Sequence, residues 1–166
     1  MQANGTLENG TDLVLRRLLA QSPSEVWHAI ADSDGLGRWF GTYTGDPASG
    51  VVQVSMNAEP GADDAEPTEY EIIECVPAAF LMVRSTTEVG TWTLSLRLVE
   101  LAEGTQISLR HHDIDVEVIG EVGAGWEWYL DRLVAAITGA VAPGLEDFEP
   151  TYFPAADHYR SLVPKD

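Results

Sequence analysis

Residues 120–137, GEVGAGWEWYLDRLVAAI, carry the most regular pattern in the chain. Apolar side chains recur at helical spacing from about residue 121 to residue 141. They are Val122, Trp126, Tyr129, Leu130, Leu133, Ile137 and Val141. A helix of this length spans roughly 30 Å, close to the length of a strand of about ten residues. The pattern therefore predicts one long amphipathic helix that can lie along a whole sheet.

Three glycines stand at the start of this helix, at Gly120, Gly123 and Gly125. Each lowers helix propensity by up to about 1 kcal/mol relative to alanine. Close packing against another segment would account for them, and so would local mobility. The sequence leaves both explanations open.

The segments before the helix have the pattern of strands. Turn residues such as Pro60-Gly61 and Gly90 separate most of them, and the short spacing implies antiparallel hairpins. The expected strands cover about residues 12–21, 39–45, 50–57, 68–76, 79–87, 91–101 and 104–113. In the clearest one, Trp92, Leu94, Leu96 and Leu98 alternate with polar residues, which gives the sheet one apolar face. We therefore expect an α+β fold with a curved antiparallel sheet of about six to seven strands.

A capping box marks a short helix after the first long strand. Ser22 is suited to the N-cap, Pro23 to the first helical position and Glu25 to the return contact with the cap amide. Val26, Ala29 and Ile30 then form one apolar face, and the helix should end near residue 31.

At 166 residues the chain fits one domain with a single core. We expect a flexible N-terminus over residues 1–11, the folded domain over 12–141, and an extension over 142–166. The extension looks extended, but its aromatic residues Phe148, Tyr152, Phe153 and Tyr159 suggest that it docks partly on the domain. Residues 58–71 carry six acidic residues and no basic one, as in a solvated, mobile loop.

The charge balance is strongly acidic, with 9 Lys plus Arg against 27 Asp plus Glu and a formal net charge of -18. Such a field repels phosphate backbones and anionic lipids, so we expect no nucleic-acid and no membrane partner. Cys75 is the only cysteine, which excludes an internal disulfide and fits a reducing compartment. We expect Cys75 to be a small buried apolar residue. The N-terminus has no signal-peptide pattern. We expect a soluble, cytoplasmic protein.

The order of these elements resembles the helix-grip architecture of the START-like, or SRPBCC, superfamily. Several short motifs resemble its branch named after the heat-shock ATPase activator homologue (AHSA). They are residues 22–32 (SPSEVWHAIAD), Leu36 with Trp39-Phe40, residues 74–77 (ECVP), residues 104–109 (GTQISL), and Gly125-Trp126 with Leu130 and Leu133. The resemblance covers roughly residues 12–141. It implies a cavity between the sheet and the long helix, where START-like relatives bind apolar small molecules.

Seven residues are candidates to line that cavity: Trp39, Phe40, Trp92, His111, Trp126, Tyr129 and Leu133. For any one of them, plain core packing is the alternative. Buried Trp and Tyr need partners for their polar groups, so several of them on facing elements favour a pocket. His111 is the candidate acid or base, although a strand-end residue of the core or rim without chemical function is the simpler interpretation.

Nothing in the sequence has the spacing of a metal or nucleophile motif. His111 and His112 are neighbours on a strand and point to opposite faces. Glu127 and Asp131 should face solvent, because the apolar stripe of the long helix faces inward. We therefore assign no catalytic residue, no metal and no cofactor.

These observations favour a domain that binds an apolar or aromatic small molecule without catalysis. A cyclase or aromatase that uses the same cavity is the main alternative, and a chaperone-binding module is a third. A homodimer stays open as a partner state, since homodimers are common.

Overall fold

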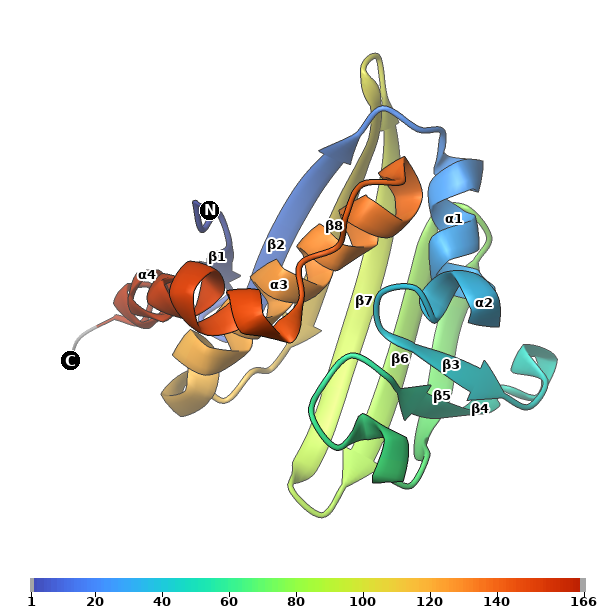
Figure 1. Ribbon diagram of the computed structural model, residues 1–166, viewed down its shortest axis with the longest axis horizontal. Coiled ribbons are helices and arrows are strands. Elements are labelled where there is room, and N and C mark those ends of the chain that lie inside the picture. The colour runs from blue at the N-terminus through green and yellow to red at the C-terminus, as the bar shows by residue number, and fades with distance from the viewer. Residues whose placement is uncertain (1, 165–166) are drawn as a thin grey trace.

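The computed structural model of the protein describes residues 2–164. Its centre is one curved, antiparallel sheet with the order β1-β2-β8-β7-β6-β5-β4-β3 (Figure 1). The strands are β1 (Thr6–Glu8), β2 (Asp12–Leu19), β3 (Gly41–Thr44), β4 (Val51–Met56), β5 (Thr68–Val76), β6 (Phe80–Thr87), β7 (Gly90–Leu101) and β8 (Gly104–His112). The helices are α1 (Pro23–Ala31), α2 (Ser33–Leu36), α3 (Ile119–Thr138) and α4 (Ala156–Ser161). The predicted α+β helix-grip fold is confirmed, with eight strands rather than six or seven.

The additional strand lies in the segment that was expected to be flexible. Residues 6–8 form β1, which pairs antiparallel with β2, and the backbone N–H of Asn4 donates to Glu127 Oε1 at 3.1 Å. Three residues are too few to give a readable alternation in the sequence. The N-terminus is therefore the edge of the sheet.

The two ends of the sheet are covered by different helices. The long helix α3 packs along β2, with Leu130 and Leu133 fully buried, and α1 and α2 lie at the opposite side of the concave face (Figure 1). The capping box of α1 is present, with Ser22 and Glu25 bonded to each other's backbone amides. The long helix ends earlier than predicted, at Thr138, because Gly139 adopts a left-handed C-cap with φ of 76°. Val141 is consequently exposed.

The C-terminal segment packs on α3 through short helical turns and α4, rather than as an extended chain. The turns span Leu145–Asp147, Phe148–Tyr152 and Phe153–Ala155. Tyr159 of α4 is completely buried, and its ring lies where a side chain at Gly5 or Gly123 would overlap it. A side chain at Gly120 would meet Arg160, whereas none lies within 4 Å of the equivalent position at Gly125. Close packing against the buried ring of Tyr159 thus explains Gly123, whereas the neighbour of Gly120 is the flexible, partly exposed side chain of Arg160.

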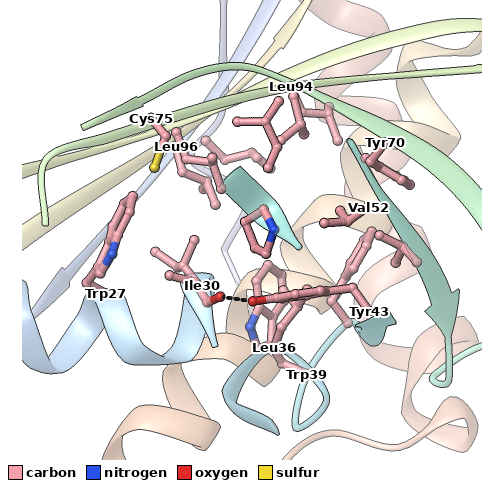
Figure 2. Close-up of a pocket in the computed structure, with 18 of the residues that line it drawn as sticks. Trp27, Ile30, Leu36, Trp39, Tyr43, Val52, Tyr70, Cys75, Leu94 and Leu96 are labelled. Carbon is pink, nitrogen blue, oxygen red and sulfur yellow. Dashed lines mark hydrogen bonds between the residues drawn. The ribbon is translucent and has the colours of Figure 1, made fainter. Parts of the chain in front are cut away.

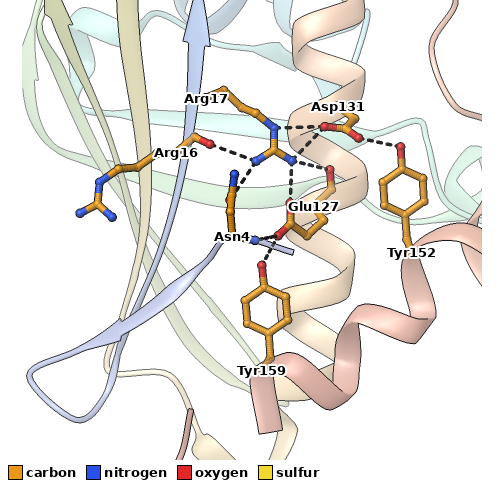
Figure 3. A network of polar contacts seen from close by, with 7 residues as sticks. All are labelled: Asn4, Arg16, Arg17, Glu127, Asp131, Tyr152 and Tyr159. Carbon is orange, nitrogen blue, oxygen red and sulfur yellow. Dashed lines mark hydrogen bonds and ion pairs between the residues drawn. The ribbon is translucent and has the colours of Figure 1, made fainter. Parts of the chain in front are cut away.

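A polar network fixes both termini to the outer side of α3 (Figure 3). Arg17 Nη2 lies 2.6 Å from Glu127 Oε2 and 2.9 Å from Asp131 Oδ1. The hydroxyl of Tyr159 donates to Glu127, and that of Tyr152 donates to Asp131 Oδ2 at 2.9 Å. Burial, together with the bond to Glu127, raises the pKa of the Tyr159 hydroxyl, which therefore stays a donor.

The expectation that Glu127 and Asp131 face solvent is wrong for Glu127, whose side chain is 0% exposed, and incomplete for Asp131, which is 33% exposed. The helical pattern correctly placed both residues away from the apolar stripe. It did not reveal that the C-terminal segment and β2 cover this side of α3.

Candidate ligand cavity

An apolar cavity of about 150 Å³ lies beneath α1 and α2 on the concave face of the sheet (Figure 2). Its walls come from α1, α2, β3 to β8 and one residue of α3. The lining residues are Trp27, Ile30, Ala31, Leu36, Trp39, Phe40, Tyr43, Pro47, Val52, Val54, Tyr70, Ile72, Cys75, Leu81, Val83, Leu94, Leu96, Leu109 and Trp126. Because Pro47 and Cys75 are exposed, the cavity opens to solvent beside them.

The helical side of the cavity is fixed by hydrogen bonds to the end of α1. Trp39 Nε1 donates to the carbonyl of Ala29 at 2.8 Å, and the Tyr43 hydroxyl donates to the carbonyl of Ala31 at 2.7 Å. The last turn of a helix has carbonyls without partners inside the helix. The two aromatic side chains satisfy these carbonyls and turn their apolar faces to the cavity (Figure 2).

A β-bulge decides which residue of β5 reaches the cavity. Ile72 pairs with Val83 and Glu74 pairs with Met82, so the register shifts by one residue at Ile73. A bulge reverses the alternation of the side chains that follow it. As a result Cys75 lines the cavity, where a regular strand would have placed Glu74. Cys75 lies near Trp27 at the rim and is exposed, which corrects its interpretation as a small buried residue (Figure 2).

Most polar atoms of the inner wall have partners within the protein, whereas the indole N–H of Trp27 and the thiol of Cys75 lie at the partly exposed rim. The indole N–H groups of Trp39 and Trp126 and the hydroxyl of Tyr43 donate to protein acceptors, and Tyr70 lies beside buried Ser85. Within residues 2–164, the one buried side-chain N or O atom without a partner is Gln21 Oε1, which lies outside this cavity. A polar group placed against the inner wall would lose its hydration without gaining a hydrogen bond from Trp39, Tyr43 or Trp126.

Three of the seven candidate residues line the cavity: Trp39, Phe40 and Trp126. The other four lie elsewhere. Leu133 is core beneath α3, Tyr129 packs between Phe40 and Trp126, His111 is buried behind Trp126, and Trp92 is 40% exposed. Sequence reasoning missed Trp27, Ile30 and Ala31, which form a second stripe on α1 beside the core residues Val26 and Ala29.

His111 is part of an aromatic cluster rather than an exposed acid or base. Trp126 Nε1 donates to His111 Nδ1 at 3.2 Å, and the ring of Trp92 lies 4.6 Å from the ring of His111. Burial, with a smaller contribution from the charge of His112, lowers the pKa of His111 to about 4. The imidazole is therefore neutral near pH 7 and accepts a hydrogen bond from Trp126.

Because His111 is buried in its neutral form, we predict that the free energy of unfolding decreases as the pH is lowered from 6.5 to 4. In that window the unfolded chain binds a proton at residue 111 that the folded protein does not bind, so acid favours unfolding. When the pH is lowered from 7.5 to 5, the free energy of unfolding of the wild type should decrease by about 2 kcal/mol more than that of His111→Gln. The glutamine amide oxygen can still accept a hydrogen bond from Trp126. Urea unfolding of both proteins at the two pH values measures the difference. Equal losses would show that His111 is not buried as described.

Tyr129 links α3 to the acidic segment. Its hydroxyl donates to Glu59 Oε1 at 2.6 Å, and burial raises the pKa of that hydroxyl. Asn57 Nδ2 also donates to the carbonyl of Gly37 at 2.8 Å. The start of residues 58–71 is thus tied to the rest of the domain at two points.

A second groove, of about 590 Å³, lies between α1, α2 and the end of α3. Its lining includes the exposed polar residues Glu25, His28, Asp32 and Arg38. A wide polar groove of this kind removes little apolar surface from water, so the smaller apolar cavity is the better ligand site.

Among the side chains described in residues 2–62 and 64–164, no group of three or more His, Cys, Asp or Glu is arranged to hold a metal ion. No helix in the same range has the length and apolar character needed to cross a membrane.

Comparison with known proteins matches the chain to one family model. The model described as "Activator of Hsp90 ATPase homolog 1-like protein" matches residues 20–138. A comparison with curated proteins gives no match.

Solved structures share the fold. CalU16 from Micromonospora echinospora is 26% identical, with a TM-score of 0.75 over 93% of this chain and 89% of its own. The protein encoded by gene BPP1335 of Bordetella parapertussis is 20% identical, with a TM-score of 0.73 over 99% and 92%. DynU16, a protein of the dynemicin biosynthetic locus, is 21% identical, with a TM-score of 0.66 over 78% and 48%. The last two show the likeness in fold alone.

Proposed function

The chain belongs to the Activator of Hsp90 ATPase homolog 1-like family, and from this premise we propose that it binds an apolar small molecule without converting it. The observation that carries the proposal is the cavity beneath α1 and α2, whose wall is apolar and whose Trp39, Tyr43 and Trp126 donors have protein partners. A ligand there is held by removal of its surface from water, which contributes about 25 cal/mol per Å².

The size of the cavity narrows the ligand class. A dry apolar cavity of about this volume accommodates one benzene ring. The buried part of the ligand is therefore a single ring or a short branched chain, and any larger or polar part extends past Pro47 and Cys75 into solvent.

The lining also argues against catalysis within the cavity. It includes no carboxylate, histidine, lysine or arginine side chain. General acid–base catalysis most often uses such a group within hydrogen-bond reach of the reacting atom. Of the tyrosines in the wall, Tyr43 already donates to the carbonyl of Ala31, and burial raises the pKa of Tyr70. His111, the acid or base expected for a cyclase, is separated from the cavity by Trp126 and already accepts a bond from it.

A cavity-filling substitution tests the proposal. Leu96→Trp places an indole in the cavity, whereas Val99→Trp places one on the opposite, half-exposed face of β7. Titration with benzene, followed by amide chemical shifts of β7 and β8, should show binding to the wild type. Leu96→Trp should weaken it at least about tenfold, a loss of about 1.4 kcal/mol.

Val99→Trp should bind benzene like the wild type. If Leu96→Trp is poorly folded, Leu94→Phe, which adds a smaller group to the same wall, replaces it in the titration. Benzene binding that is equal in the wild type and in a folded cavity-filled variant would refute the assignment of the site.

A further inference from the structure

We propose that the C-terminal segment, residues 145–163, sets the affinity of the cavity although it does not line it. This positioning role rests on the proposed function. It follows from two chains of contacts that lead across α3 to the cavity wall, one from Phe148 and one from Pro143 and Gly144, which directly precede the segment.

The first chain of contacts is aromatic. The ring of Phe148 lies edge-on to Trp128 at 6.2 Å, and Trp128 lies edge-on to Tyr129 at 5.0 Å. Tyr129 then packs against Phe40 at 5.3 Å, and Phe40 lines the cavity. Protein interiors are packed like crystals, so a ring that loses its neighbour on one side can shift. Removal of Phe148 would free Trp128 and, through Tyr129, the wall residue Phe40.

The second chain of contacts is polar and passes through Arg132. Its Nε donates to the carbonyl of Trp39, a wall residue, at 3.1 Å, and its Nη1 donates to the carbonyl of Pro143 at 2.9 Å. The same guanidinium lies over the ring of Trp128, and Trp128 Nε1 donates to the carbonyl of Gly144 at 3.0 Å. One side chain thus holds both the root of the C-terminal segment and the backbone of the cavity wall.

The far end of the segment is anchored on the outer side of α3. Tyr159 fills the space left by Gly5 and Gly123 and bonds to Glu127, the neighbour of the wall residue Trp126. The segment therefore grips α3 on the side opposite the cavity. Docking of the segment and occupation of the cavity both favour the same position of α3, and such a coupling is reciprocal.

Truncation of the first contact tests the coupling. Phe148→Ala should weaken benzene binding roughly 5-fold to 50-fold, within the usual range for coupled sites. Phe153→Ala is the comparison: its ring is 44% exposed and packs on Phe148 at 6.4 Å, one contact further from Trp128, so its removal should weaken binding much less. In the wild type, saturating benzene should in turn slow amide hydrogen exchange in α4.

The outcomes separate this inference from the proposed function. If the wild type binds benzene and Phe148→Ala binds it equally well, the coupling is refuted while the cavity stands. If neither the wild type nor any variant binds benzene, the proposed function fails. The effect of the C-terminal segment on the cavity wall is then measured by amide hydrogen exchange of the wall residues. Phe148→Ala, much more than Phe153→Ala, should then speed exchange of the backbone amides of Trp39 and Phe40. Unchanged rates at both amides would overturn the coupling.

Discussion

Glu127→Ala is expected to lower the free energy of unfolding by about 3–5 kcal/mol, the usual cost of breaking a buried ion pair. Glu127 is completely buried and compensates the largely buried Arg17 at 2.6 Å. Its loss leaves the guanidinium with Asp131 alone, and it also removes the acceptor of Tyr159 and of the Asn4 amide. Urea unfolding at pH 7 measures the change.

Two comparisons show whether the unpaired charge causes that loss. Glu121→Ala removes an exposed glutamate from the same helix, where an ion pair contributes little, and should change stability far less. The double variant Arg17→Met, Glu127→Leu removes both charges and should recover part of the stability, because Tyr159 and the Asn4 amide still lack their acceptor. A double variant as unstable as Glu127→Ala would mean that lost packing, not the charge, dominates.

Gly123→Ala and Gly125→Ala are expected to change stability in opposite directions. An added methyl at Gly123 overlaps the ring of Tyr159, and overpacking of this kind costs about 1–3 kcal/mol. An added methyl at Gly125 meets no atom within 4 Å, so the gain in helix propensity, up to about 1 kcal/mol, should dominate. Each variant adds one methyl group to the same helix, at positions two residues apart. Thermal unfolding compares them directly.

A third variant identifies the contact responsible. In a Tyr159→Ala background the ring is absent. Gly123→Ala should then change the free energy of unfolding by about as much as Gly125→Ala does. If Gly123→Ala remains destabilising in that background, the glycine is required for a reason other than the docking of α4.

Much of the fold could be predicted because its signals are local. The capping box at Ser22, the alternation around Leu96 and the helical stripe around Leu130 depend on residues within a few positions of each other. The short strand β1 could not be predicted, since three residues carry no readable period. The same holds for the early end of α3, because an apolar Val141 continues the helical spacing although Gly139 has already ended the helix.

The candidate site was harder to predict because long-range packing decides it. Trp39, Phe40 and Trp126 were identified from their place on facing elements. Trp92 and His111 lie on the inward face as predicted, but beyond Trp126, which separates them from the cavity. The bulge at Ile73 reversed the alternation of β5, and sequence alternation alone cannot reveal a bulge.

The buried network was missed for a related reason. Glu127 and Arg17 are 110 positions apart, and only the docked C-terminal segment turns the polar side of α3 into an interior. The helical pattern shows from sequence alone that these polar residues lie away from the apolar stripe. It does not indicate whether another segment covers them.

The most direct test of the central claim is a crystal structure of the protein under xenon pressure. Xenon binds dry apolar cavities and requires no knowledge of the natural ligand. We predict a xenon atom beneath α1, in contact with Leu94 and Leu96, and no such atom in Leu96→Trp. A wild-type crystal without xenon at this position, or with ordered water in its place, would contradict the proposal that this cavity is an apolar ligand site.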